Sequence, residues 1–178
     1  MSQKAHVMLD LESMDLQPTA AIISIGAVVF KGAERRTFYM PVDLMSSIAA
    51  GCSVGLDTVR WWDRQSVEAR YVLRDPRKVN LVEALQQFGS FIRDVGMAAG
   101  AEVCVWGNGA ATDNAILAYA YARVGMSRPW GHWNDRCYRT IAAGISAPWV
   151  HNGVAHIALD DAIAQADFIM AHAPGAVV

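Results

Sequence analysis

A short apolar run near the start of the chain, residues 6–11, ends in two carboxylates separated by one residue, Asp10 and Glu12. A run of this length suits a strand that is buried on both faces of a sheet. Side chains two positions apart on a strand point to the same face, so both carboxylates would face one site. A strand buried in this way needs a layer of structure on each side, which favours an α/β architecture.

The rest of the pattern predicts three further strands and several helices. Strands are expected over residues 20–30, 35–41 and 102–106, and the Lys31-Gly32 turn makes the first three an antiparallel meander. Apolar residues at three- and four-residue steps predict the clearest helix over residues 79–95. Further helices are expected over residues 58–73 (with a break near residue 64), 113–124, 135–143 and 159–172. This order implies an α/β fold with a mixed sheet covered on both sides by helices.

The composition limits the class of protein. At 178 residues and 53% hydrophobic content, the chain is long enough for one well-cored domain, expected over residues 1–178. No apolar run approaches the roughly 20 residues needed to cross a bilayer, and no secretory signal is evident, so no membrane association is expected. Cys52, Cys104 and Cys137 form no Cys-x-x-Cys pair, which favours reduced thiols and a cytoplasmic location.

The charge balance gives no overall attraction to nucleic acid, because the formal net charge is −2. Basic residues are nevertheless concentrated in residues 60–78 and 123–139. Such groups are usually a solvated helix face, but as a set they can contact phosphates around an acidic cleft. If nucleic acid is bound, a low net charge predicts contact with a few nucleotides rather than with a long duplex.

Two more acidic positions follow apolar segments. Asp113 comes after the predicted strand at 102–106, and His156 precedes Asp161 by five positions at the start of the last predicted helix. Each aspartate taken alone also fits a helix N-cap. Carboxylates that lie close together repel, and hard divalent cations such as Mg²⁺ or Mn²⁺ relieve this repulsion. An imidazole titrates near neutrality and suits a general base that takes a proton from water.

These motifs, in this order, resemble the three exonuclease motifs of the DnaQ-like, or DEDDh, 3′–5′ exonucleases, which have a ribonuclease H-like fold. The closer likeness is to the exonuclease VIII-like and RNase T-like branch, and it covers roughly residues 6–170. It rests on Asp10-Leu11-Glu12-Ser13-Met14, Ser24-Ile25-Gly26-Ala27-Val28, Thr58-Val59-Arg60-Trp61-Trp62, Val105-Trp106-Gly107-Asn108-Gly109 and Leu159-Asp160-Asp161-Ala162.

The resemblance implies a ribonuclease H-like mixed five-stranded sheet flanked by helices, and two divalent cations, Mg²⁺ or Mn²⁺. Asp10 would bridge the two ions, Glu12 and Asp161 would complete the site nearer the attacking water, and Asp113 would hold the second ion. His156 would deprotonate the nucleophile. The implied activity is 3′–5′ hydrolysis of single-stranded DNA or RNA ends or overhangs, with release of nucleoside 5′-monophosphates. Related exonucleases are often dimers, so a homodimer is also an option.

Contacts to substrate are expected from residues near the motifs: Ser13, Met14, Trp62, Asn108 and Arg139. Of the adjacent Trp61 and Trp62, at most one is expected in the core, which leaves the other to stack on a base. Many relatives have an aromatic residue where this chain has Thr112, and threonine where it has Ser13. Two alternatives stay open: a non-catalytic nucleic-acid-binding module on the same fold, and a ribonuclease H-type endonuclease.

Overall fold

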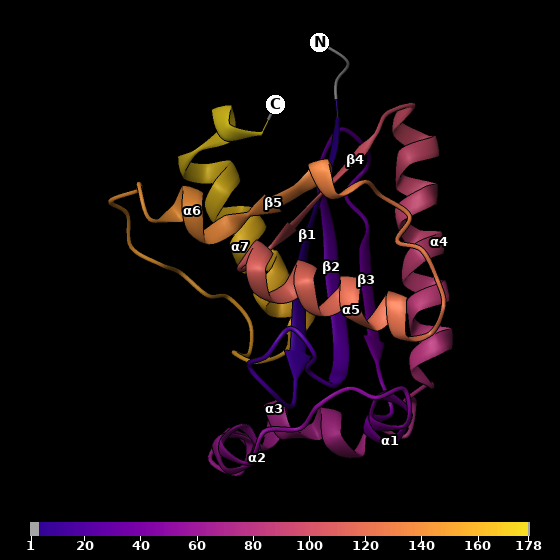
Figure 1. Cartoon of the computed structure of the whole chain (residues 1–178). Coiled ribbons are helices and arrows are strands. Elements are labelled where there is room, and N and C mark those ends of the chain that lie inside the picture. Colours follow the sequence, from indigo (N-terminus) through magenta and orange to yellow (C-terminus); the bar gives the residue numbers. More distant parts are fainter. Residues whose placement is uncertain (1–3, 178) are drawn as a thin grey trace.

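A computed structural model describes residues 4–177 and contains one five-stranded sheet with strand order β3-β2-β1-β4-β5 (Figure 1). Strands β1 (Ala5–Ser13), β2 (Ile22–Lys31) and β3 (Thr37–Pro41) form the expected antiparallel meander. Strands β4 (Val103–Gly107) and β5 (Asp135–Cys137) extend the sheet on the other side of β1 in parallel. The predicted mixed five-stranded sheet is therefore confirmed.

Three short helices lie together at one end of the sheet (Figure 1). They are α1 (Leu44–Ala49), α2 (Leu56–Trp62) and α3 (Val67–Arg70), and a 3₁₀ turn, η1 (Tyr71–Arg74), follows α3. Asp43 caps α1 and Ser66 caps α3, because each side chain accepts a hydrogen bond from a free backbone N–H of the first turn. The break expected near residue 64 lies between α2 and α3.

Longer helices flank the sheet (Figure 1). They are α4 (Leu81–Ala99), α5 (Ala115–Arg123) and α7 (Ala158–His172). The short α6 (Tyr138–Ala142) comes between α5 and α7 in the sequence. Single turns occur at η2 (Ala110–Asn114), η3 (His132–Asn134) and η4 (Pro174–Ala176). Asn80 caps the start of α4, and Gly100, whose φ is +58°, ends it in the left-handed conformation that glycine adopts readily. In the described residues, no helix is long and apolar enough to cross a membrane.

The single helix expected over residues 135–143 is wrong. Residues Asp135–Cys137 form β5, and only Tyr138–Ala142 are helical. Three residues are too few to show a strand period. Pairing with β4 determines their extended conformation, which is a tertiary effect that local propensity does not reveal.

Alternate residues of β1 pack against different layers. Val7 and Leu9 belong to a core cluster that includes buried residues of α4 and α5. Met8 belongs to a second cluster, on the other face, that includes Ala162 and Ala166 of α7. The two-residue period therefore directs Asp10 and Glu12 to the face that α7 covers.

Candidate active site

The first two carboxylates lie buried at the carboxyl end of β1. Asp10 is 6% exposed and Glu12 is 7% exposed. Opposite Asp10 in the neighbouring strand is Gly26, and a Cβ there would lie 2.2 Å from the carbonyl carbon of Ala158. The missing side chain lets the start of α7 approach the sheet backbone closely, which brings the acidic first turn of α7 to the end of β1.

Asp113 reaches the same place from η2, the turn that follows β4. Its Oδ2 accepts hydrogen bonds from the Gly109 backbone N–H at 3.0 Å and from the Thr112 hydroxyl at 3.1 Å, and its Oδ1 accepts from the Leu11 N–H at 3.3 Å. The last of these bonds joins η2 to β1 between Asp10 and Glu12. Asp113 is thus held by fixed donors rather than serving as the N-cap of a regular helix.

Asp161 lies in the first turn of α7, and His156 lies in the loop before it. The backbone N–H of His156 donates to Asp161 Oδ2 at 2.9 Å. His156 has φ of +67°, a left-handed conformation that is uncommon for a residue with a side chain and recurs at functional sites. Potential ligand atoms of Glu12, His156 and Asp161 all lie within 4.8 Å of one another.

Burial and mutual repulsion change the acidity of this cluster. The pKa of Asp10 is well above its usual value, because burial and then the charges of Asp113, Glu12 and Asp161 disfavour its ionised form. Burial likewise raises the pKa of Glu12, with Asp161 and Asp113 adding to the effect. For Asp113, burial raises the pKa, while its hydrogen bonds act in the opposite direction. Four carboxyl groups so arranged favour a positive counter-charge.

The donor set fits hard divalent cations. Carboxylate oxygens are the ligands that Mg²⁺ and Mn²⁺ prefer, and all four carboxylates line the cavity. Glu12 and Asp161 also lie together with the His156 imidazole, which offers one nitrogen. Asp10, Glu12, Asp113 and Asp161 would hold such ions. The bound ions would compensate the repulsion that raises the pKa values of Asp10 and Glu12.

All five residues predicted from the three motifs line one cavity of about 1130 Å³. Ser13, Asn108 and Arg139, three of the predicted substrate contacts, line it as well. Arg139 Nε donates to Asn108 Oδ1 at 3.3 Å, and Arg64 lines the same cavity. The cavity therefore combines an acidic cluster with two guanidinium groups.

Two predicted substrate contacts are corrected by the structure. Trp62 is 1% exposed, and its Nε1 donates to the Ser13 carbonyl at 3.0 Å, so it supports the end of β1 from within the core. Met14 is 4% exposed and also packs in the core. Trp61 is the tryptophan that lines the cavity, and its ring lies edge-on to the His156 imidazole with the centroids 4.7 Å apart.

Two further residues contact the carboxylates without belonging to a motif. Gln165 is 2% exposed, and its Nε2 donates to Asp10 Oδ1 at 2.8 Å. His151 Nε2 lies 2.6 Å from Asp161 Oδ1. The sequence does offer a signal for Gln165: it is a polar residue four positions after Asp161, on a helix face otherwise rich in alanine. The sequence offers no comparable signal for His151, which lies in an irregular loop.

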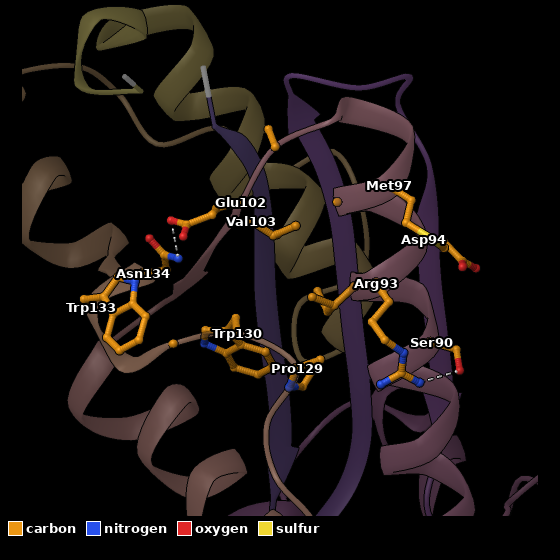
Figure 2. Close-up of a pocket in the computed structure, with 14 residues that line it drawn as sticks. Ser90, Arg93, Asp94, Met97, Glu102, Val103, Pro129, Trp130, Trp133 and Asn134 are labelled. Carbon is orange, nitrogen blue, oxygen red and sulfur yellow. Dashed lines mark hydrogen bonds between the residues drawn. The ribbon is translucent and has the colours of Figure 1, made fainter. Parts of the chain in front are cut away.

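A second hollow, of about 420 Å³, lies between α4 and the loop before β5 (Figure 2). Apolar side chains such as Trp130, Val103 and Met97 form much of its lining. Its two carboxylates do not form a cluster. Glu102 is paired with Lys4 and Asn134, and Asp94 lies apart from it on α4. This hollow therefore lacks the donor set of a cation site.

The family model described as 3′-5′ exoribonuclease Rv2179c-like domain matches residues 5–172. Comparison with curated protein sequences finds no match.

Solved structures share the fold. Cell-death related nuclease 4 (CRN-4) is 14% identical with a TM-score of 0.63, and the match covers 96% of this chain and 64% of CRN-4. The nuclease domain of 3′hExo, a DEDDh family member bound to rAMP, is 12% identical with a TM-score of 0.60, covering 95% of this chain and 92% of that one. A full-length 3′-exonuclease is 11% identical with a TM-score of 0.54, and the match covers 96% of this chain and 82% of that one.

Proposed function

This chain belongs to the Rv2179c-like 3′–5′ exoribonuclease domain family and is a 3′–5′ exonuclease, and we propose that it removes nucleoside 5′-monophosphates from the 3′ end of single-stranded RNA. The choice of RNA follows the description of the family. The observation on which the mechanism rests is the convergence of Asp10, Glu12, Asp113, Asp161 and His156 on one cavity.

In the proposed reaction, a water oxygen attacks the phosphorus of the terminal phosphodiester. The bond between phosphorus and the 3′-oxygen of the preceding nucleotide breaks, and that oxygen takes a proton from solvent. His156 accepts the proton that the attacking water loses, since its ring borders Glu12 and Asp161 in the cavity. No covalent bond to the protein forms.

Asp10, Glu12, Asp113 and Asp161 orient the cations in this mechanism. Two bound divalent ions, Mg²⁺ or Mn²⁺, would lower the pKa of the attacking water and neutralise charge on the leaving oxygen. Asp113 is suited to a fixed role, because three hydrogen bonds hold its two oxygens. Asp10 is suited to a shared role, because it interacts electrostatically with each of the other three carboxylates.

The rim of the cavity offers contacts to the RNA chain. Arg64 and Arg139, which line the cavity, would pair with phosphates of the RNA. Trp61 would stack on a terminal base, a contact worth about 1–3 kcal/mol without sequence preference. Ser13 and Asn108 line the same cavity and would contact the terminal sugar.

The test uses 5′-labelled linear RNA, the matching DNA and a closed RNA circle, each with Mn²⁺, with Mg²⁺ or with chelator. We expect stepwise shortening of linear RNA, release of 5′-monophosphates, slower loss of DNA, an intact circle and no reaction in chelator. Asp10→Asn should abolish the activity. Cleavage of the circle would indicate an endonuclease instead, and binding of RNA without any cleavage would indicate a non-catalytic module.

A further inference from the structure

A second histidine, His151, contacts one of the acidic residues of the site. Its Nε2 lies 2.6 Å from Asp161 Oδ1, and its side chain is 15% exposed. It comes from the irregular segment between α6 and α7, ten residues before Asp161. His151 lies outside the three motifs described above.

The direction of this hydrogen bond follows from the chemistry of the two groups. A carboxylate that binds a cation is ionised and only accepts hydrogen bonds, so in that state His151 Nε2 carries the proton and donates it to Asp161. On the other side of the ring, Nδ1 lies 3.0 Å from the Gly153 carbonyl oxygen and 3.2 Å from the Gly153 nitrogen. The imidazole is therefore held by its own loop on one side and by Asp161 on the other.

The same loop engages both oxygens of Asp161. Oδ1 accepts from His151, and Oδ2 accepts from the backbone N–H of His156 at 2.9 Å. The neighbouring Asp160 accepts from the Val154 N–H at 2.9 Å, which ties the middle of the loop to the same helix turn. Two adjacent carboxylates thus connect residues 151–156 to the start of α7.

We propose that His151 is a positioning residue that fixes the carboxylate of Asp161 for cation binding. Each carboxylate oxygen has two lone pairs, so a hydrogen bond on one leaves the other available to a cation. The donor restrains rotation of the carboxylate and keeps its free lone pairs toward Glu12 and His156. This inference rests on the proposed function, in which Asp161 is a cation ligand.

The test compares His151→Phe, which keeps a flat ring but removes the donor, with His151→Gln, whose amide can still donate. Asn152→Ala is the matched control, since Asn152 is an exposed neighbour in the same loop. Calorimetric titration with Mn²⁺ alone measures cation affinity. Mutation of a residue that orients a metal ligand typically lowers metal affinity about 10–100-fold. We therefore expect His151→Phe to weaken Mn²⁺ binding by about 10–100-fold.

The same variants are assayed for RNA hydrolysis across a range of Mn²⁺ concentrations. Under the proposal, His151→Phe needs more Mn²⁺ for half-maximal activity and keeps the wild-type KM for RNA at saturating Mn²⁺. His151→Gln should recover most of the cation affinity, and Asn152→Ala should match wild type in both assays. A general loss of folding would instead lower the melting temperature of His151→Phe and His151→Gln alike.

Wild-type Mn²⁺ affinity in a folded His151→Phe variant would overturn the proposal. If His151→Phe does not fold, equal weakening by His151→Gln and His151→Ala, without rescue by the retained donor, overturns it in the same way. The calorimetric comparison does not depend on catalysis. A protein that binds Mn²⁺ as expected but cuts no RNA would therefore contradict the proposed function alone.

Discussion

At the scale of single residues, the site depends on carboxylates that are buried and close enough to repel one another. Burial and the neighbouring charges raise the pKa of Asp10 above its value in an unfolded chain. Between those two pKa values the native state binds more protons than the unfolded state. The free energy of unfolding of the cation-free protein therefore falls as pH rises through this range.

Asp10→Asn removes one of these charges while keeping a side chain of similar size. In chelator at pH 7, we expect the variant to be more stable than wild type, although it should be inactive. A gain of about 1 kcal/mol would raise the melting temperature by about 2–4 °C for a chain of this length. The difference should shrink as pH falls toward the usual range of a carboxyl group, because the raised pKa of Asp10 makes the native wild-type protein bind this proton. A lower melting temperature for Asp10→Asn in chelator at pH 7 would contradict this account of the repulsion.

Gln165 has a separate role that a nearly isosteric change can isolate. Gln165→Met keeps the buried volume but removes the donor that holds Asp10 Oδ1. We expect Mn²⁺ affinity to fall about 10–100-fold with little change in melting temperature. Gln86→Met, on the exposed face of α4, is the control. Unchanged Mn²⁺ affinity in Gln165→Met would show that the hydrogen bond does not orient Asp10.

The sequence indicates the motif residues far better than the residues that support them. Asp10 and Glu12 share a strand face, and His156 and Asp161 have a fixed spacing, so a local pattern identifies them. The choice between Trp61 and Trp62 depends on how α2 is rotated against the end of β1, which no local pattern encodes. The sequence-based prediction places Trp62 in the cavity, whereas the structure places Trp61 there and buries Trp62.

At the scale of elements, the approach of α7 to the sheet brings the acidic residues together. The start of α7 lies directly over Gly26 of β2, which is the partner of Asp10. Most strands and helices follow from periodicity, and the sequence predicts them. The short β5 does not, because its conformation comes from pairing with β4 rather than from its own three residues.

Gly26→Ala tests this approach. The added Cβ would meet the backbone of Ala158 and Leu159, neither of which can rotate away, so α7 must shift. Overpacking of this kind typically costs about 1–3 kcal/mol. We expect a lower melting temperature and a larger relative loss of activity, because Asp161 moves with α7. Gly175→Ala, at a position open on all sides, serves as the control. Wild-type stability and activity in Gly26→Ala would contradict the packing described.

At the scale of the whole molecule, the balance of charge limits how the protein holds RNA. The net charge is −2, and the cavity presents two arginines, Arg64 and Arg139, beside the acidic cluster. Each phosphate contact to a single strand adds a slope of about −0.7 to the dependence of log affinity on log salt. Contact with only two phosphates therefore predicts that the affinity for RNA depends weakly on salt concentration.

We expect the affinity for single-stranded RNA to fall less than about tenfold between 50 and 200 mM salt, measured with the inactive Asp10→Asn variant. Arg139→Gln should make this slope less steep by about 0.7, which is the contribution of one phosphate contact. A loss of about a thousandfold over the same range would indicate many phosphate contacts, and the RNA path would then have to extend well beyond the cavity.

The arrangement of cations around the four carboxylates can be observed directly in crystals grown with Mn²⁺, using the anomalous scattering of manganese. We predict two Mn²⁺ ions in the cavity, with Asp10 bound to both, Glu12 and Asp161 on one and Asp113 on the other. Absence of ordered manganese among these residues at saturating Mn²⁺, or ions bound only elsewhere on the molecule, would contradict the account.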